Sequence, residues 1–180
     1  NMKRILAYGV MTWAAGAWAA AGSDGVVASI QPDPPFLAHW SFDEPSGSKC
    51  GDVSGQGCDA SLEQPAAGFS RTRGIHGQAL SLRGAYALRT RLNLPGREWP
   101  AITFSAWVRP TDLSSYREIL RQECPTRLLF SFQEGGAILS LGLNIGGYVE
   151  CDAPLQLAQV MDGMWHHCAA SFDGEWMRVY

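Results

Sequence analysis

The chain has 180 residues, of which 46% are hydrophobic and 17% are charged, and this composition excludes a wholly disordered protein. Its 14 basic and 17 acidic residues give a net charge of −3, and without a basic cluster there is no electrostatic footprint for nucleic acid. A chain of this length forms one domain that buries roughly 70% of its unfolded surface, so a single globular domain is predicted.

The N-terminus has the three parts of a secretory signal peptide. Two basic residues, Lys3 and Arg4, precede a long uncharged apolar run that ends in alanines. We predict a signal peptide over residues 1–21, with cleavage after Ala19 or Ala21. An uncleaved anchor is the alternative, because the run approaches the roughly 20 residues that a bilayer requires. The protein is thus expected to be secreted, extracellular or periplasmic, or held in the cell envelope, with no membrane span after cleavage.

A linker is predicted to precede the folded domain. Residues 22–35 are small and polar and end in a proline-rich stretch, a composition typical of linkers. The domain is expected over residues 36–180. Its first strand is predicted at residues 36–42, because apolar side chains alternate there as in a strand with one buried face.

Five cysteines in a secreted chain predict disulfides with one thiol left over. Cys50 and Cys58 bracket a glycine-rich loop, Cys124 and Cys151 lie in turn-like surroundings, and Cys168 alternates with apolar residues on a strand. We predict the bridges Cys50–Cys58 and Cys124–Cys151 and a buried free thiol at Cys168, with other pairings left open.

The second half of the chain reads as many short strands. Residues 102–110 alternate apolar and polar side chains, and residues 165–180 form two strands around Asp173-Gly174, which favours a type I′ hairpin turn. Between these segments, short apolar runs are separated by Gly or Pro. The pattern predicts an all-β protein, an antiparallel β-sandwich of two sheets.

Three motifs carry a resemblance to a known family. They are Trp-x-Phe-Asp-Glu at residues 40–44 with the Asp-x-Ser-Gly-x-Gly loop that follows, Ile-Thr-Phe-Ser-Ala-Trp-Val-Arg-Pro at 102–110, and Trp-His-His with Phe-Asp-Gly at 165–174. They resemble laminin-G-like, concanavalin-A-like jelly-roll modules. The resemblance spans residues 36–180 and implies a jelly roll with one or more further strands beyond Tyr180.

The resemblance also implies a calcium ion. Asp43, Asp52 and Asp59 stand among glycines that expose backbone carbonyls, and calcium prefers such oxygen ligands on a flexible loop. The alternative is that Asp52 and Asp59 cap turns through hydrogen bonds to their own backbone. Calcium is therefore the cofactor that we predict.

Exposed tryptophans are the expected platform for sugars. Trp107 and Trp176 lie opposite the apolar residues of their strands, so we predict carbohydrate binding there, with burial under a loop as the alternative. Trp40 shares its face with apolar neighbours and is predicted to lie in the core.

No catalytic residue is predicted in this segment. Glycosidases with this fold place two carboxylates on one strand face as Glu-x-Asp-x-x-Glu, and this run is absent. The nearest pair, Glu118 and Glu123, has an odd spacing that predicts opposite faces. His166 and His167 are adjacent and should also point to opposite faces, which prevents them from sharing a metal ion.

These observations favour a non-catalytic recognition or adhesion module for a glycan or an extracellular protein, with further domains expected C-terminally. Two alternatives remain. The chain is an N-terminal accessory module of a secreted glycoside hydrolase or other hydrolase with a catalytic domain beyond Tyr180, or it is a structural spacer. Nucleic acid is not an expected partner.

Overall fold

The computed structural model describes residues 4–8, 36–62, 69–83, 88–90, 92, 101–115, 117–123 and 126–180. The predicted linker, Cys124 and most of the predicted signal peptide lie outside these residues.

Within the described residues the chain is almost entirely β-structure. The strands in chain order are β1 (Arg4–Tyr8), β2 (Lys49–Cys50), β3 (Ala60–Leu62), β4 (Phe69–Arg73), β5 (Gln78–Arg83), β6 (Leu88–Thr90), β7 (Ile102–Pro110), β8 (Arg117–Gln122), β9 (Leu128–Gln133), β10 (Ile138–Asn144), β11 (Tyr148–Pro154), β12 (His166–Phe172) and β13 (Met177–Val179). Two single turns of helix accompany them, a 3₁₀-helix (Glu134–Gly136) and α1 (Leu157–Val160).

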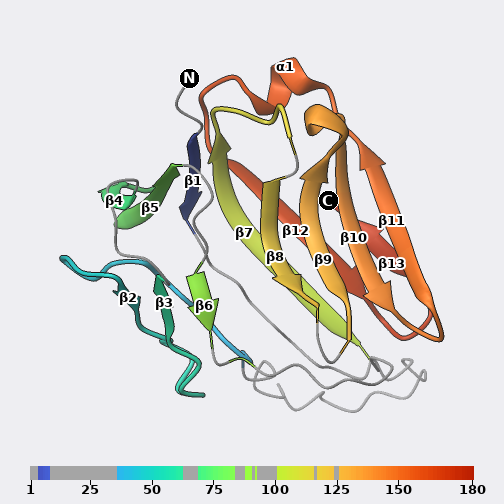
Figure 1. The fold of residues 1–180 in the computed structure, drawn as a ribbon, viewed down its shortest axis with the longest axis horizontal. Coiled ribbons are helices and arrows are strands. Elements are labelled where there is room, and N and C mark those ends of the chain that lie inside the picture. The colour runs from blue at the N-terminus through green and yellow to red at the C-terminus, as the bar shows by residue number, and fades with distance from the viewer. Residues whose placement is uncertain are drawn as a thin grey trace, which may run out of the picture.

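The strands form three antiparallel sheets. Six strands follow the order β13-β12-β7-β1-β5-β4, four follow β11-β10-β9-β8, and three follow β2-β3-β6. In Figure 1 the four-stranded sheet lies in front of β12 and β13, and the three-stranded sheet lies at the lower left. The predicted all-β fold of antiparallel sheets is confirmed.

The main core lies between the six-stranded and four-stranded sheets. Alternate residues of β7 and β12 point into it, as the sequence predicted, and they meet the inward residues of β9 and β10. Phe104 and Phe130 pack with ring centroids 6.3 Å apart, and both are fully buried. Other members of this core are Ile102, Ala106, Val108, Leu113, Leu128, Phe132, Leu139, Leu141, Leu143, Cys168, Ala170 and Phe172.

A smaller core surrounds Trp40 and contains Ala38, Phe42, Cys50, Ala60 and Leu80. Trp40 is 4% exposed, which confirms its predicted place in a core, and its indole N–H donates to the Cys58 carbonyl at 2.9 Å. The prediction of a strand over residues 36–42 was wrong, because this segment makes only an isolated bridge between Trp40 and Asp52. Phe42 has a φ of 61°, a left-handed conformation that ends an extended run.

The final hairpin is present, but its turn differs from the predicted type I′. The backbone N–H of Asp173 donates to the Trp176 carbonyl at 3.3 Å, so Gly174 and Glu175 are the two central residues. Gly174 has a φ of 98°, whereas Glu175 does not have a positive φ. Type I′ requires positive φ at both positions, and glycine at the first position alone corresponds to type II′.

One strand of the six-stranded sheet comes from the extreme N-terminus. β1 pairs with β5 on one side and with β7 on the other (Figure 1). These five residues belong to the segment predicted as a signal peptide, which remains a prediction for the segment as a whole.

Candidate functional site

Four residues form an aromatic block on the outer face of the six-stranded sheet. Trp107 and Arg109 are on β7, His167 is on β12, and Trp165 immediately precedes β12. The rings of Trp107 and His167 have centroids 5.1 Å apart, and the Arg109 guanidinium lies 5.1 Å from the centre of the Trp165 ring. The block therefore consists of two neighbouring cross-strand pairs.

Strand alternation explains why these side chains meet. The antiparallel ladder sets His167 opposite Trp107 and His166 opposite the buried Val108. The residue before His166 is therefore brought opposite Arg109, which places Trp165 beside the guanidinium. His167 is exposed and the other three members of the block are half-buried, so the block reaches solvent on the side away from the main core.

Sequence reasoning identified Trp107 but missed Arg109 and Trp165. Arg109 lies two residues after Trp107 and so on the same strand face, a signal that was present in the sequence. Trp165 joins the block only through the register between β7 and β12, which the sequence does not state.

Trp176 is not part of the aromatic block. Its side chain is 60% exposed, in the turn that follows Phe172, and Phe172 pairs with Ile102 at the far end of β7 from Trp107. The structure therefore separates the two tryptophans predicted as carbohydrate platforms.

The carboxylate of Asp52 holds the glycine-rich loop together. One oxygen, Oδ1, accepts the backbone N–H groups of His39 and Ser54 at 2.9 Å, and Oδ2 accepts that of Cys58 at 2.9 Å. Partial burial acts to raise the pKa of Asp52, but hydrogen bonds from Ser54, His39 and Cys58 outweigh it and lower the pKa to about 2. Asp52 therefore caps the loop, as the turn-capping alternative expected.

The other two predicted calcium ligands have separate partners. Asp43 Oδ1 accepts the Gln78 N–H at 2.7 Å, and Asp59 Oδ1 accepts the Asp52 N–H at 2.9 Å. Among the residues that the structure describes, no group of three or more His, Cys, Asp or Glu side chains could hold a metal ion. We assign calcium no role in this geometry, and it stays a prediction of the sequence.

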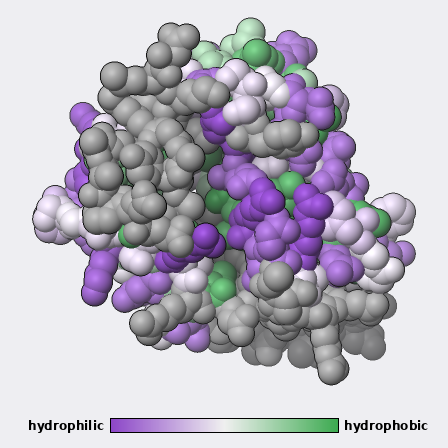
Figure 2. Space-filling view, viewed as in Figure 1, coloured by the Kyte–Doolittle hydropathy of each residue, from purple (hydrophilic) through white to green (hydrophobic). Residues whose placement is uncertain are grey.

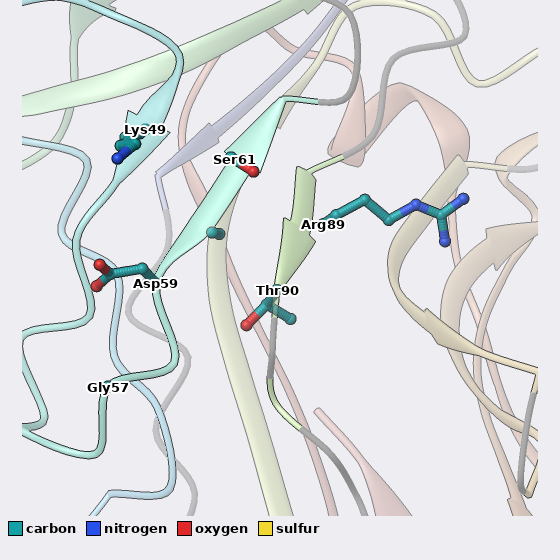
Figure 3. A pocket seen from close by; sticks show the side chains of 7 residues that line it. Lys49, Gly57, Asp59, Ser61, Arg89 and Thr90 are labelled. Atoms are coloured by element: carbon teal, nitrogen blue, oxygen red, sulfur yellow. The ribbon is translucent and has the colours of Figure 1, made fainter.

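A half-open pocket of about 300 Å³ lies on the three-stranded sheet (Figure 3). Its lining includes the polar residues Lys49, Asp59, Ser61, Arg89 and Thr90 together with Gly57 and Ala60. Figure 3 shows the Arg89 side chain extending away from Lys49 and Asp59. The hydroxyl of Thr90 donates to the Cys58 carbonyl at 2.9 Å, which ties this pocket to the glycine-rich loop.

The cysteines differ from the prediction. Cys50, Cys58, Cys151 and Cys168 are free thiols, so the predicted Cys50–Cys58 bridge is not formed. Cys50 pairs with Ala60 across β2 and β3, which places Cys58 diagonally rather than directly opposite. Cys168 is free and 5% exposed, and burial raises the pKa of its thiol to about 12. The predicted partner of Cys151, Cys124, lies outside the described residues.

The acidic pair that the sequence placed on opposite faces lies on one side. A β-bulge between Glu118 and Leu120 shifts the strand alternation, and Arg121 forms ion pairs with both Glu118 and Glu123. Both carboxylates are therefore engaged by the same guanidinium.

His166 and His167 point to opposite faces of β12. The His166 Nε2 atom lies 3.0 Å from Asp162 Oδ1, and His167 packs on Trp107. Asp162 also accepts the Met164 N–H, and this bond together with His166 lowers the pKa of Asp162. The two imidazoles thus have separate partners, one at the start of β12 and one in the aromatic block.

A polar strip runs along the outer face of β9 and β10, and sequence reasoning missed it. Ser131 and Ser140 pair directly, are fully buried and have hydroxyls without a hydrogen-bond partner. Gln133, on the same face, has an unpartnered amide nitrogen. The hydrophilic side chains near the middle of the view in Figure 2 are a separate feature, because Ser131 and Ser140 are fully buried. The strip is therefore a buried polar cluster, on the sheet that does not carry the aromatic block.

The fold defines a β-sandwich domain that carries the aromatic block on the outer face of its six-stranded sheet. Residues 84–180, more than half of the chain, match the family model Laminin_G_3, described as concanavalin A-like lectin/glucanases superfamily. The protein therefore belongs to the concanavalin A-like lectin/glucanase superfamily. The comparisons with curated proteins and with solved structures found no match to the chain.

None of the helices in the described residues is long and apolar enough to cross a bilayer.

Proposed function

We propose that this domain is a non-catalytic recognition module that binds glycans through the aromatic block. The observation that carries the proposal is the pairing of two tryptophans with two nitrogen-rich side chains on one solvent-facing patch of β7 and β12. Membership of a superfamily that includes lectins agrees with this assignment.

The chemistry of the block suits a sugar. The faces of the Trp107 and Trp165 rings carry negative π density that complements the C–H groups of a pyranose. The Arg109 guanidinium and the His167 ring, each stacked beside an indole, can donate hydrogen bonds to sugar hydroxyls. A ligand would therefore find stacking surface and polar donors within one patch, the combination that gives a binding site both affinity and orientation.

The setting of the module is part of the proposal. The predicted signal peptide supports an extracellular or cell-envelope location, where glycans are abundant. Within a longer polypeptide, the module would hold a partner domain against a glycan surface. This is also what the accessory-module alternative requires, because glycan binding by this domain serves an adhesin and a hydrolase equally.

The test is a glycan-array screen of the full chain followed by titration calorimetry with the best ligand. Trp107→Ala and Trp165→Ala should each weaken binding about tenfold, since stacking of one ring contributes about 0.5–1.5 kcal/mol and lost donors add to it. Val53→Ala, at a side chain that is 59% exposed in the glycine-rich loop, is the control and should bind as the unmodified chain does.

Two results would contradict glycan binding at the aromatic block. One is a chain that binds no glycan on the array. The other is a ligand that is lost on Trp176→Ala and retained on Trp107→Ala, which would move the site to the hairpin turn.

A further inference from the structure

The aromatic block continues onto a third strand through Tyr180. The backbone N–H of Tyr180 donates to the Ala169 carbonyl at 2.8 Å, and the Ala169 N–H donates to the Tyr180 carbonyl at 3.0 Å. Tyr180 is therefore directly opposite Ala169, which on its other side pairs with Ser105 of β7. This cross-strand row lies next to the row of Trp107 and His167.

The Tyr180 side chain lies on the same face of the sheet as the block. Met177 and Val179 of β13 pack against the main core, so strand alternation directs Arg178 and Tyr180 to the opposite, outer face. Tyr180 is 67% exposed there. It is the diagonal neighbour of His167, and diagonal neighbours in a sheet lie within reach of aromatic side chains. Rings on β7, β12 and β13 thus line one outer surface.

This surface is named the aromatic track, and its rings belong to Trp165, Trp107, His167 and Tyr180. The side chains of Ser105 and Ala169, in the row of Tyr180, are short and leave the surface beside Tyr180 low. Arg178 forms an ion pair with Asp173 at 2.5 Å, which balances the charge next to Tyr180. This end of the track therefore suits a neutral ligand with apolar faces, such as a sugar ring.

The track is longer than one sugar ring requires. Trp165 and Ala169 are four residues apart, and a strand rises about 3.4 Å per residue, so Trp165 and the row of Tyr180 are separated by about 14 Å. A bound monosaccharide would contact only part of this length. A linear chain of β-1,4-linked pyranoses is extended and presents C–H faces at regular intervals, so successive rings stack along such a track.

We propose that Tyr180 is a specificity-determining residue that extends the glycan site to a linear chain of β-1,4-linked pyranoses. The inference rests on the proposed function, because it takes the aromatic block as one end of the same site. A sugar held by Trp107 and Trp165 is followed by others that pass His167, and a later ring of the chain stacks on Tyr180. Capture of the ligand belongs to β7 and the start of β12, and selection for chain length belongs to β13.

Titration calorimetry on the full chain tests this with cellobiose and cellohexaose, and with chitobiose and chitohexaose. The hexasaccharide of at least one series should bind about tenfold more tightly than its disaccharide, since one further ring is stacked. Tyr180→Ala should weaken hexasaccharide binding about three- to tenfold and leave disaccharide binding within about twofold. Trp107→Ala should weaken the binding of both.

Trp176→Ala is the matched control. Its ring is 60% exposed in the same hairpin but lies four residues from Tyr180 and outside the track, so both affinities should stay within about twofold. Tyr180→Ala keeps its backbone bonds to Ala169, and thermal unfolding followed by circular dichroism checks that the variant is folded.

A second pair of variants tests the path of the chain. Ala169→Gln fills the low surface between His167 and Tyr180 and should reduce hexasaccharide binding. Ser171→Gln lies on the same face of β12, beyond the track, and should not. If Ala169→Gln does not fold, the length dependence of Tyr180→Ala decides alone.

The failures of the two proposals are distinguishable. Equal affinity for disaccharide and hexasaccharide, with both weakened by Trp107→Ala, would overturn the role of Tyr180 and leave the proposed function intact. A hexasaccharide advantage that survives Tyr180→Ala would also overturn it, because a long chain then gains only from its several equivalent registers on the block. Binding of an array glycan at the block, without binding of either β-1,4-linked series, would overturn the ligand class. If Trp107→Ala changes the binding of no sugar, the proposed function fails and this inference fails with it.

Discussion

The main core between the two larger sheets and the smaller core around Trp40 have different surroundings. The main core is lined by strands of six to nine residues whose apolar side chains alternate inward. The smaller core takes one residue, Leu80, from the six-residue β5, and its other strand borders are β2 and β3, of two and three residues, with loop between them. Polar side chains bound to the backbone of those loops hold the smaller core.

Arg71 shows how a side chain fixes the loops and short strands around the smaller core. Its side chain is only 8% exposed, and its guanidinium donates to the carbonyls of Phe42 at 2.6 Å and Lys49 at 2.9 Å. It also forms an ion pair with Glu44 at 2.7 Å. Long strands satisfy their own backbone through ladders, whereas short strands and loops need side chains for the same purpose. The two cores should therefore respond differently to loss of apolar volume and loss of charge.

The largest effect is expected from Phe130→Ala in the main core. Removing a fully buried ring leaves a cavity, and we expect a loss of about 4 kcal/mol in the free energy of unfolding. Urea denaturation gives the magnitude, with the exposed Val149→Ala as the control, expected to change stability by less than about 0.5 kcal/mol. A loss below about 1 kcal/mol for Phe130→Ala would mean that this core is loosely packed.

A smaller and more local effect is expected from Arg71→Met. The substitution keeps an apolar stem but leaves two backbone carbonyls and Glu44 without their partner, and we expect a loss of about 3 kcal/mol. Adding Glu44→Gln should recover part of this loss, since a neutral amide is cheaper to leave unpaired than a charge. Hydrogen exchange should show faster exchange in β2–β4 than in β9 and β10. Uniform acceleration would show that the two cores unfold as one unit.

The smallest effect is expected from acid acting on Asp52. The pKa of Asp52 is about 2 in the folded chain against an ordinary 3.8, so its contribution is present above about pH 4 and is lost as pH falls towards 2. We expect about 1 kcal/mol after allowing for the exposure of the carboxylate to solvent. Urea denaturation at pH 6, 4 and 2.5 should show this loss as the difference between the unmodified chain and Asp52→Asn. Parallel pH profiles for the two proteins would rule out this role for Asp52.

Long, regularly alternating strands were the part of the fold that the sequence predicted well. Residues 102–110 and 166–172 show their burial pattern directly in the order of their side chains. The segment 36–42 alternates in burial too, yet the left-handed Phe42 and the lack of a partner strand prevent it from forming a strand. Alternation reports which face is buried, and pairing depends on residues far away in the chain.

The candidate site likewise has features that local sequence predicts and features that depend on distant residues. Trp107 could be predicted because its place opposite the apolar residues of β7 is a local property. Trp165 and the grouping of Glu118 with Glu123 could not, since one depends on the register between β7 and β12 and the other on a bulge. The Asp52 bonds to His39 and Cys58 join residues thirteen and six positions away, distances over which turn rules give no guidance.

The Asp52 carboxylate also determines in which redox conditions the glycine-rich loop can form. It joins the chain before, inside and after the glycine-rich loop while Cys50 and Cys58 are both thiols. The loop is thus closed by hydrogen bonds, which need no oxidant to form. Glutathione at cytosolic concentrations has no disulfide to reduce there. The smaller core can therefore form in a reducing compartment as well as in an oxidising one, and a reducing expression host is a suitable source of the folded domain.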